Sequence, residues 1–288
     1  GVMCTARDLL IYARLLMNGG VYNGKRYLSE EFVKAAVSKQ ADNNLGSSLA
    51  LHKNHGYGYL IWKLPRDGFA FVGAATQLVI CDPGTDLVFV INSENIYRDE
   101  SVYAIIMHEL YQYIIPALGE PLPEAPSALT ALREHEASAK LVALEGGVNT
   151  NFAEIINGRK YILEDNGNGI RYVKFTFEGD RGVMEFEDEN GINHLTFGIG
   201  YNELGEFPGK KRMSIVASQY IDGTYKCATS AIWCEEQKLH IMSQVIDDYL
   251  GNVHIVAGFK DDRISISMTK HAQRILDNYN GKLIGKAE

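Results

Sequence analysis

One tetrapeptide of the sequence, Ser267 to Lys270, matches the Ser-x-x-Lys pattern in which a lysine activates a serine nucleophile. The residues around it alternate between apolar and polar types. The apolar positions are Ile264, Ile266 and Met268. Such alternation is typical of a strand with one buried and one solvated face. We therefore expect Ser267 to lie on the surface of a strand and not to act as a nucleophile.

Other patterns that could bind a metal or perform catalysis are incomplete. Tyr-x-Asn and Gly-x-Ser-x-Gly do not occur in the sequence. His108 and Glu109 begin a His-Glu-x-x-His zinc pattern, but Gln112 stands where the second histidine is required. Residues 165–169 resemble a calcium loop, but Gly167 lacks the side-chain oxygen needed at the third position. We expect a helix-surface histidine, a turn, no metal ion and no cofactor.

The first part of the chain has the pattern of helices packed on a sheet. Thr5 and Asp8 form a capping-box pattern before apolar residues at helical spacing, and a second helix is expected to begin at Ser29. Residues 57–91 contain short runs rich in aromatic and β-branched residues, which predict an antiparallel meander. Helical spacing returns after Asp99, so a layered α+β unit is expected.

A proline-rich segment and a run of strands follow. Four of the seven prolines lie between Pro116 and Pro126, which marks a domain boundary, and residues 127–144 have a composition compatible with a helix. From Arg159 onward, eight or nine short strand-like segments are separated by turns, as in a lipocalin-like barrel or a sandwich. We expect the aromatic side chains of this domain either to pack in its interior or to line a ligand cavity. These residues are Tyr161, Tyr172, Phe175, Phe177, Phe186, Phe197, Tyr220, Tyr225, Trp233 and Phe259.

Composition argues against some classes of partner. The formal net charge is −8, and the basic residues 210–212 form only one short cluster, so nucleic acid is not an expected partner. No apolar run approaches the roughly 20 residues of a membrane-spanning helix. The four cysteines are expected to be free thiols, and Cys227 and Cys234, seven residues apart, would lie on opposite faces of one strand.

Three stretches together resemble the β-lactamase-related serine hydrolases, the superfamily that includes penicillin-binding proteins and esterases. They are residues 1–20 with Thr5-Ala6-Arg7-Asp8-Leu9, residues 55–62 with Tyr57-Gly58-Tyr59, and residues 71–92 with Gly73-Ala74 and Asp82-Pro83. The resemblance implies that residues 1–115 are the C-terminal half of a hydrolase domain. A proline-rich linker and helix would follow at 116–150, and an antiparallel β-barrel or sandwich at 151–288. The resemblance also favours a cell-envelope or other extracytoplasmic location. The sequence itself leaves the compartment open.

In that family the catalytic serine and its Tyr-x-Asn partner lie upstream of the stretch that matches residue 1, so the resemblance implies no catalytic residue in this chain. It implies instead one edge of a substrate groove, formed by Phe71, Val72, Gly73, Ala74 and Gln77, with the Ala74 N–H directed at an oxyanion. Phe71 stands where lysine or histidine is common, which disfavours penicillin recognition. The alternative is that Phe71 and Val72 are ordinary core residues of a strand.

The sequence thus predicts an inactive C-terminal fragment of a serine hydrolase that acts on an amide or an ester. The alternative is a non-catalytic protein, a pseudoenzyme platform with a barrel that binds a small molecule or a protein. For the strand at Leu87 to Asn92 we expect an exposed edge that pairs with the missing N-terminal half or with a second copy of the chain.

Overall fold

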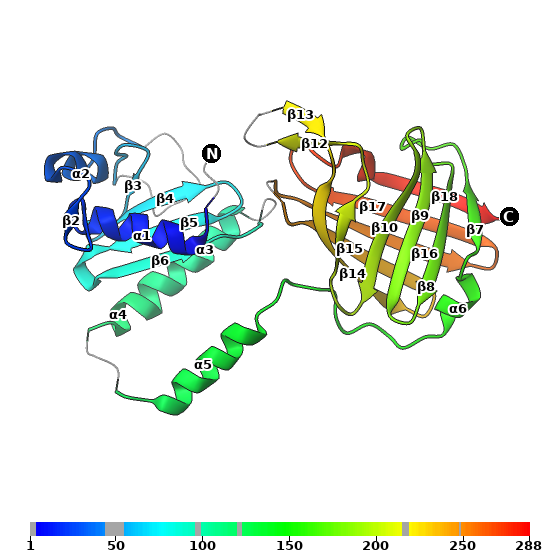
Figure 1. Ribbon diagram of the computed structural model, residues 1–288, viewed down its shortest axis with the longest axis horizontal. Helices are drawn as coiled ribbons and strands as arrows, with labels where there is room; N and C mark the ends of the chain where they lie inside the picture. Colours follow the sequence, from blue (N-terminus) through cyan, green and yellow to red (C-terminus); the bar gives the residue numbers. More distant parts are fainter. Residues whose placement is uncertain (1–3, 44–54, 96–98, 120–122, 215–218, 248) are drawn as a thin grey trace. The chain divides into compact units, whose positions relative to one another are not determined.

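The computed structural model describes residues 4–43, 55–95, 99–119, 123–214, 219–247 and 249–288. The chain forms two compact units, Val2–Glu124 and Ala125–Glu288 (Figure 1). The first unit contains helices and a small sheet, and the second is dominated by a large, closed sheet.

The first unit places helices on both faces of an antiparallel sheet. Its helices are α1 (Ala6–Met17), α2 (Glu30–Val37), α3 (Asp99–Glu109) with a π-helical turn at Leu110–Ile114, and α4 (Ile115–Ala117). Its strands are β1 (Val21–Tyr22), β2 (Lys25–Arg26), β3 (Trp62–Lys63), β4 (Phe69–Gly73), β5 (Gln77–Asp82) and β6 (Leu87–Ile91), and a 3-10 turn spans Pro83–Thr85. Strands β3 to β6 pair in chain order. Phe69 and Cys81 pack against α1 and α2, whereas Ala70 and Ile80 pack against α3.

Two features of this unit test the sequence patterns directly. The capping box at the start of α1 is confirmed, because the Thr5 N–H donates to Asp8 Oδ2 at 2.9 Å and the Asp8 N–H donates to Thr5 Oγ1 at 3.2 Å. The Thr5 hydroxyl also donates to Asp8 Oδ2 at 2.7 Å, and this hydrogen bond, followed by the one from the Thr5 N–H, lowers the pKa of Asp8. Strand β6 is the terminal strand of the sheet and pairs only with β5 among the described residues. Pairing of its other edge with another chain stays a prediction.

The second unit begins with α5 (Pro126–Ser138) and an extended segment that leads to α6 (Phe152–Ile156). The expected helix over 127–144 is therefore too long. Its last residues are extended because they bind the sheet: the Leu144 N–H donates to Ser230 Oγ at 2.9 Å, and the Val148 N–H donates to the Trp233 carbonyl at 2.7 Å.

Ten of the twelve remaining described strands belong to one sheet that closes into a β-barrel, which decides between the two expected all-β architectures, and the two strands of residues 211–222 form a separate hairpin. The twelve strands are β7 (Lys160–Leu163), β8 (Tyr172–Glu178), β9 (Arg181–Asp188), β10 (Gly191–Ile199), β11 (Glu203–Phe207), β12 (Lys211–Ser214), β13 (Gln219–Asp222), β14 (Tyr225–Glu235), β15 (Lys238–Val245), β16 (Asn252–Lys260), β17 (Arg263–His271) and β18 (Gly281–Ala287), with a 3-10 turn at Asp277–Tyr279. The sheet order is β10-β9-β8-β7-β18-β17-β16-β15-β14-β11. The sheet closes where β10 runs parallel to β14, with Gly198 opposite Ser230. Nine of the described strands form the closed ring, and β11 extends the contact along β14.

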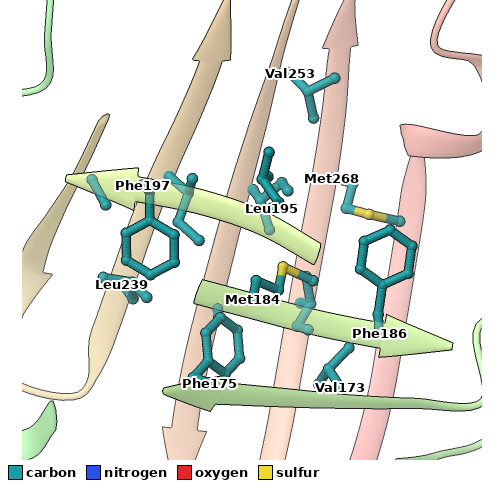
Figure 2. Packing of buried hydrophobic residues seen from close by; sticks show 14 of the residues in the cluster. Val173, Phe175, Met184, Phe186, Leu195, Phe197, Leu239, Val253 and Met268 are labelled. Atoms are coloured by element: carbon teal, nitrogen blue, oxygen red, sulfur yellow. The ribbon is translucent and has the colours of Figure 1, made fainter. Parts of the chain in front are cut away.

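The barrel interior is a packed apolar core (Figure 2). Phe175, Leu195 and Phe197 are each at most 1% exposed. A side chain next to a cavity large enough for water would retain solvent-accessible surface. These three side chains have almost none, so other protein atoms surround them on all sides. Helix α6 closes one end, where the Phe152 ring lies 5.9 Å from the Trp233 ring.

Most of the aromatic set therefore fills the core, as one of the two interpretations predicted. The exceptions are Tyr172, whose hydroxyl donates to Glu185 on the outer face, and Tyr220, which is 55% exposed. Cys227 lies inside the barrel and Cys234 is exposed, so their opposite orientation is confirmed, and all four cysteines are free thiols.

Candidate functional site

A cavity of about 430 Å³ lies at the mouth of the barrel, the end opposite α6. It forms where the ends of β9 and β11, the β12–β13 hairpin, the start of β14 and the connection between β17 and β18 meet. Its wall residues are Asp188, Asn190, Asn193, Phe207, Pro208, Gly209, Lys210, Lys211, Tyr220, Thr224, Tyr225, Ile275, Leu276, Asp277, Asn278 and Tyr279. The volume falls within the range of small-molecule sites, roughly 300–1,000 Å³.

The floor of the cavity is apolar and closely packed. Phe207, Tyr225 and Ile275 are almost fully buried, and the Phe207 and Tyr279 rings meet edge to face with centroids 4.7 Å apart. The Tyr279 hydroxyl donates to the Pro208 carbonyl at 3.1 Å, so it ties the β17–β18 connection to the segment after β11. Burial, followed by the charge of Asp188, raises the pKa of Tyr279, so this hydroxyl stays protonated.

Two further tyrosines hold the walls in place. The Tyr220 hydroxyl donates to the Arg274 carbonyl at 2.9 Å, which links β13 to the β17–β18 connection. The Tyr225 hydroxyl accepts a hydrogen bond from the Met213 N–H, which links β14 to β12. The walls are therefore cross-linked around the cavity before any ligand is present.

The rim of the cavity is polar and carries both signs of charge. Lys210 donates to the Asn190 carbonyl at 2.8 Å, so its positive charge is not neutralised by that contact. Lys211 is exposed and pairs with no acidic side chain among the described residues. The carboxylate of Asp277 is bound by Lys270, which lies outside the cavity wall and also donates to the Ile275 carbonyl at 3.0 Å. The two lysines are thus available to a ligand that carries negative charge or strong acceptors.

The residues of the groove edge expected in the first unit lie on β4, on β5 and in the turn between these strands, and their role at a substrate groove stays a prediction. Phe71 packs toward α1, with its ring 5.6 Å from that of Tyr12, whereas Val72 packs on the opposite face of the sheet. Gly73 pairs with Gln77 across the β4–β5 hairpin, and Ala74 is exposed in the turn.

Gln77 has a structural contact of its own. Its amide nitrogen donates to the Ser93 carbonyl and its amide oxygen accepts from the Ser93 N–H at 3.3 Å. This side chain fastens the segment after β6 to the hairpin. Phe71 and Val72 pack on opposite faces of the sheet, as neighbouring residues of a strand do.

The remaining sequence candidates are placed as expected. Ser267 is exposed on the outer face of β17, while Lys270 binds Asp277 and the Ile275 carbonyl, so the two side chains do not meet. In residues 165–169 the Asn166 side chain accepts from the Asn168 and Ile170 N–H groups at 3.2 Å each, which makes the segment a turn.

Sequence reasoning missed the cavity as a unit. It noted 210–212 as a basic cluster and Tyr220 and Tyr225 as aromatics, but it did not single out Phe207 or residues 275–279. The one available signal was the pair Ile275 and Leu276, buried apolar residues in a connection between two strands.

Fold and site together define a small β-barrel with a pocket at its mouth. No protein-family model and no curated protein matches the chain. Among solved structures it is similar to a fatty acid-binding protein from the brain of Drosophila melanogaster, at 15% identity and a TM-score of 0.31, over 46% of this chain and 98% of that one. It is also similar to a fatty-acid-binding protein of Manduca sexta, at 12% identity and a TM-score of 0.28, over the same shares. At these identities the likeness concerns the fold alone.

These findings correct the first functional prediction. The chain was expected to be a serine-hydrolase fragment, and this is wrong: the solved structures that it resembles are fatty-acid-binding proteins. The family resemblance of residues 1–115 stays a prediction. None of the described helices is both long and apolar enough to cross a membrane.

Proposed function

We propose that the barrel binds a small amphipathic molecule in the cavity at its mouth. The observation that carries this proposal is the composition of the cavity: an aromatic floor at Phe207 and Tyr279 beneath a rim with two exposed lysines. The floor would contact the apolar body of the ligand. Lys210, Lys211 and the amide of Asn193 would bind a carboxylate, sulfonate or phosphate group.

The packed core supports a site at the mouth in preference to one deep in the barrel. Phe186 and Met268 are packed in the barrel interior at 3% and 2% exposure (Figure 2), and the Phe186 ring lies 6.3 Å from the ring of Tyr279 in the cavity wall. A ligand that entered the barrel would have to displace side chains packed at crystal-like density. A ligand at the mouth needs no such rearrangement, because the three tyrosine hydroxyl bonds already hold the walls.

Titration of the full chain with anilinonaphthalene sulfonate, an anionic amphipathic dye, tests the proposal. We expect saturable one-site binding with a rise in dye fluorescence. The double variant Lys210→Gln/Lys211→Gln should bind at least about tenfold more weakly, because a charge-assisted hydrogen bond contributes about 1.5–3 kcal/mol. The matched control is Lys260→Gln/Lys286→Gln, which removes two exposed lysines at the opposite end of the barrel, where β16 ends and β17 begins.

Two results would overturn the proposal. One is non-saturable binding by the native chain. The other is an equal loss of affinity in the mouth variant and the control, since this would mean that net charge and not the cavity attracts the dye.

A further inference from the structure

Three histidines lie on three neighbouring strands of the barrel, on its outer face. His240 belongs to β15, His254 to β16, and His271 is the last residue of β17. The residues that precede and follow His254, Val253 and Ile255, are buried in the core, so the imidazole points outward. All three side chains are half-buried.

The strand register brings the three rings together along a diagonal. His254 lies directly opposite Met242 on one side and Thr269 on the other. His240 and His271 are two residues further along their strands, in opposite directions, and diagonal neighbours of this kind are within reach of long side chains. The ring centroids are 5.1 Å apart for His240 and His254, and 5.2 Å apart for His254 and His271.

The first two rings face each other through their nitrogens. His240 Nε2 and His254 Nδ1 are 2.9 Å apart, so one nitrogen donates a hydrogen to the lone pair of the other. Burial lowers the pKa of His240, and burial with the charges of His240 and His271 lowers the pKa of His254 to about 4. These two imidazoles are therefore neutral at pH 7, which is the form that binds metal ions.

We propose that His240, His254 and His271 form a binding site for a divalent transition-metal ion of the zinc class. Zinc binds imidazole nitrogen at about 2.0–2.1 Å in tetrahedral geometry, so two ligand nitrogens lie about 3.3–3.4 Å apart. The His240 and His254 nitrogens need to separate by only about 0.4–0.5 Å to reach that spacing. The shared hydrogen moves to the outer nitrogen of its own ring by tautomer exchange, so both rings stay neutral and no proton is released.

The third ligand requires a side-chain movement. No three His, Cys, Asp or Glu side chains already converge on one point in the part of the chain that the structure describes. The His271 ring must rotate toward the other two, and His271 is the last residue of β17, where the β17–β18 connection begins. An all-imidazole set favours zinc, copper and nickel over magnesium and calcium, which prefer oxygen ligands.

Isothermal titration of the full chain, without a histidine tag, tests the site with Zn²⁺ and with Mg²⁺. We expect one Zn²⁺ per chain and no heat of binding for Mg²⁺. His254→Gln, which removes the central ligand, should weaken Zn²⁺ binding by more than the roughly 10–100-fold that loss of an outer-shell partner costs. His240→Gln and His271→Gln should each weaken it as well. The control His194→Gln removes another outer-face histidine, which lies 3.3 Å from Glu185, and should leave the affinity unchanged.

Absence of Zn²⁺ binding by the native chain would overturn the proposal. Equal affinity in His254→Gln and the native chain would do the same. Near-ultraviolet circular dichroism of each variant shows whether it is still folded, which separates loss of a ligand from loss of the fold. A folded His240→Gln variant that binds Zn²⁺ as tightly as the native chain would also overturn the proposal.

Discussion

Acidification provides a direct test of the environment assigned to His254. The pKa of this histidine is about 4 in the folded chain, below the ordinary 6.5, because burial and two neighbouring imidazoles disfavour its charged form. Between these pH values the unfolded chain binds a proton that the folded chain does not bind. The free energy of unfolding should therefore fall as the pH decreases from about 6.5 to about 4, and His254 should make no further contribution above or below this window.

The pKa difference sets the size of this effect. A pKa that falls from 6.5 to about 4 corresponds to a loss of about 3.4 kcal/mol in the free energy of unfolding. Because the side chain is half-exposed, solvent screening reduces the expected loss to about 1–2 kcal/mol. Urea unfolding followed by fluorescence measures it, with Trp233 as the reporter of the barrel core in a Trp62→Phe background. We expect the stability difference between this protein and its His254→Gln variant to shift by that amount between pH 7 and pH 4.5.

Other titrating groups act on both proteins, so only the difference between them reports on His254. The charges that act on His254 come from His240 on β15 and His271 on β17. Parallel pH profiles for the two proteins would refute the reasoning. So would an NMR titration in which the pKa of the His254 ring is 6.5 or higher.

Two further predictions concern packing and assembly. Gly182→Ala should destabilise the barrel by about 1–3 kcal/mol in the same urea assay, because its new Cβ would lie 2.2 Å from the buried Phe197 ring. The control is Gly205→Ala, whose new Cβ would meet open space, and it should change the stability by less than about 0.5 kcal/mol. If β6 pairs with a second copy of the chain, sedimentation should reveal a dimer whose fraction rises with concentration. The amides of residues 87–91 should gain protection from hydrogen exchange as the dimer forms. A monomer at every concentration would contradict the pairing.

Local patterns in the sequence were sufficient to predict several elements. The alternation around Ser267 predicts both the strand and its faces, and Ile264, Ile266 and Met268 are buried in the barrel. The capping box at Thr5 predicts the start of α1. In both cases the determining contacts lie within a few residues of each other, so the information is present in a short window of sequence.

The end of α5 could not be predicted in this way. Residues 139–144 have a composition that a helix tolerates, but Leu144 and Val148 donate hydrogen bonds to β14, more than 80 residues further along the chain. Long-range contacts of this kind override helix propensity, whose differences amount to less than about 1 kcal/mol per residue for most residues.

The same limit applies to the cavity and to the histidine site, and it explains why both escaped the sequence analysis. The cavity needs Phe207 to meet Tyr279, and these residues meet only because closure of the barrel at β10 and β14 brings several connections to one end. The histidines need the observed register, which sets His254 opposite Met242 and Thr269 with His240 and His271 as diagonal neighbours. A slip of one residue would turn the His254 ring into the core. Neither condition leaves a local pattern. Functional groups assembled by the register of a barrel can therefore be recognised only after its strand pairing is known, whereas the strands themselves can be predicted from alternation alone.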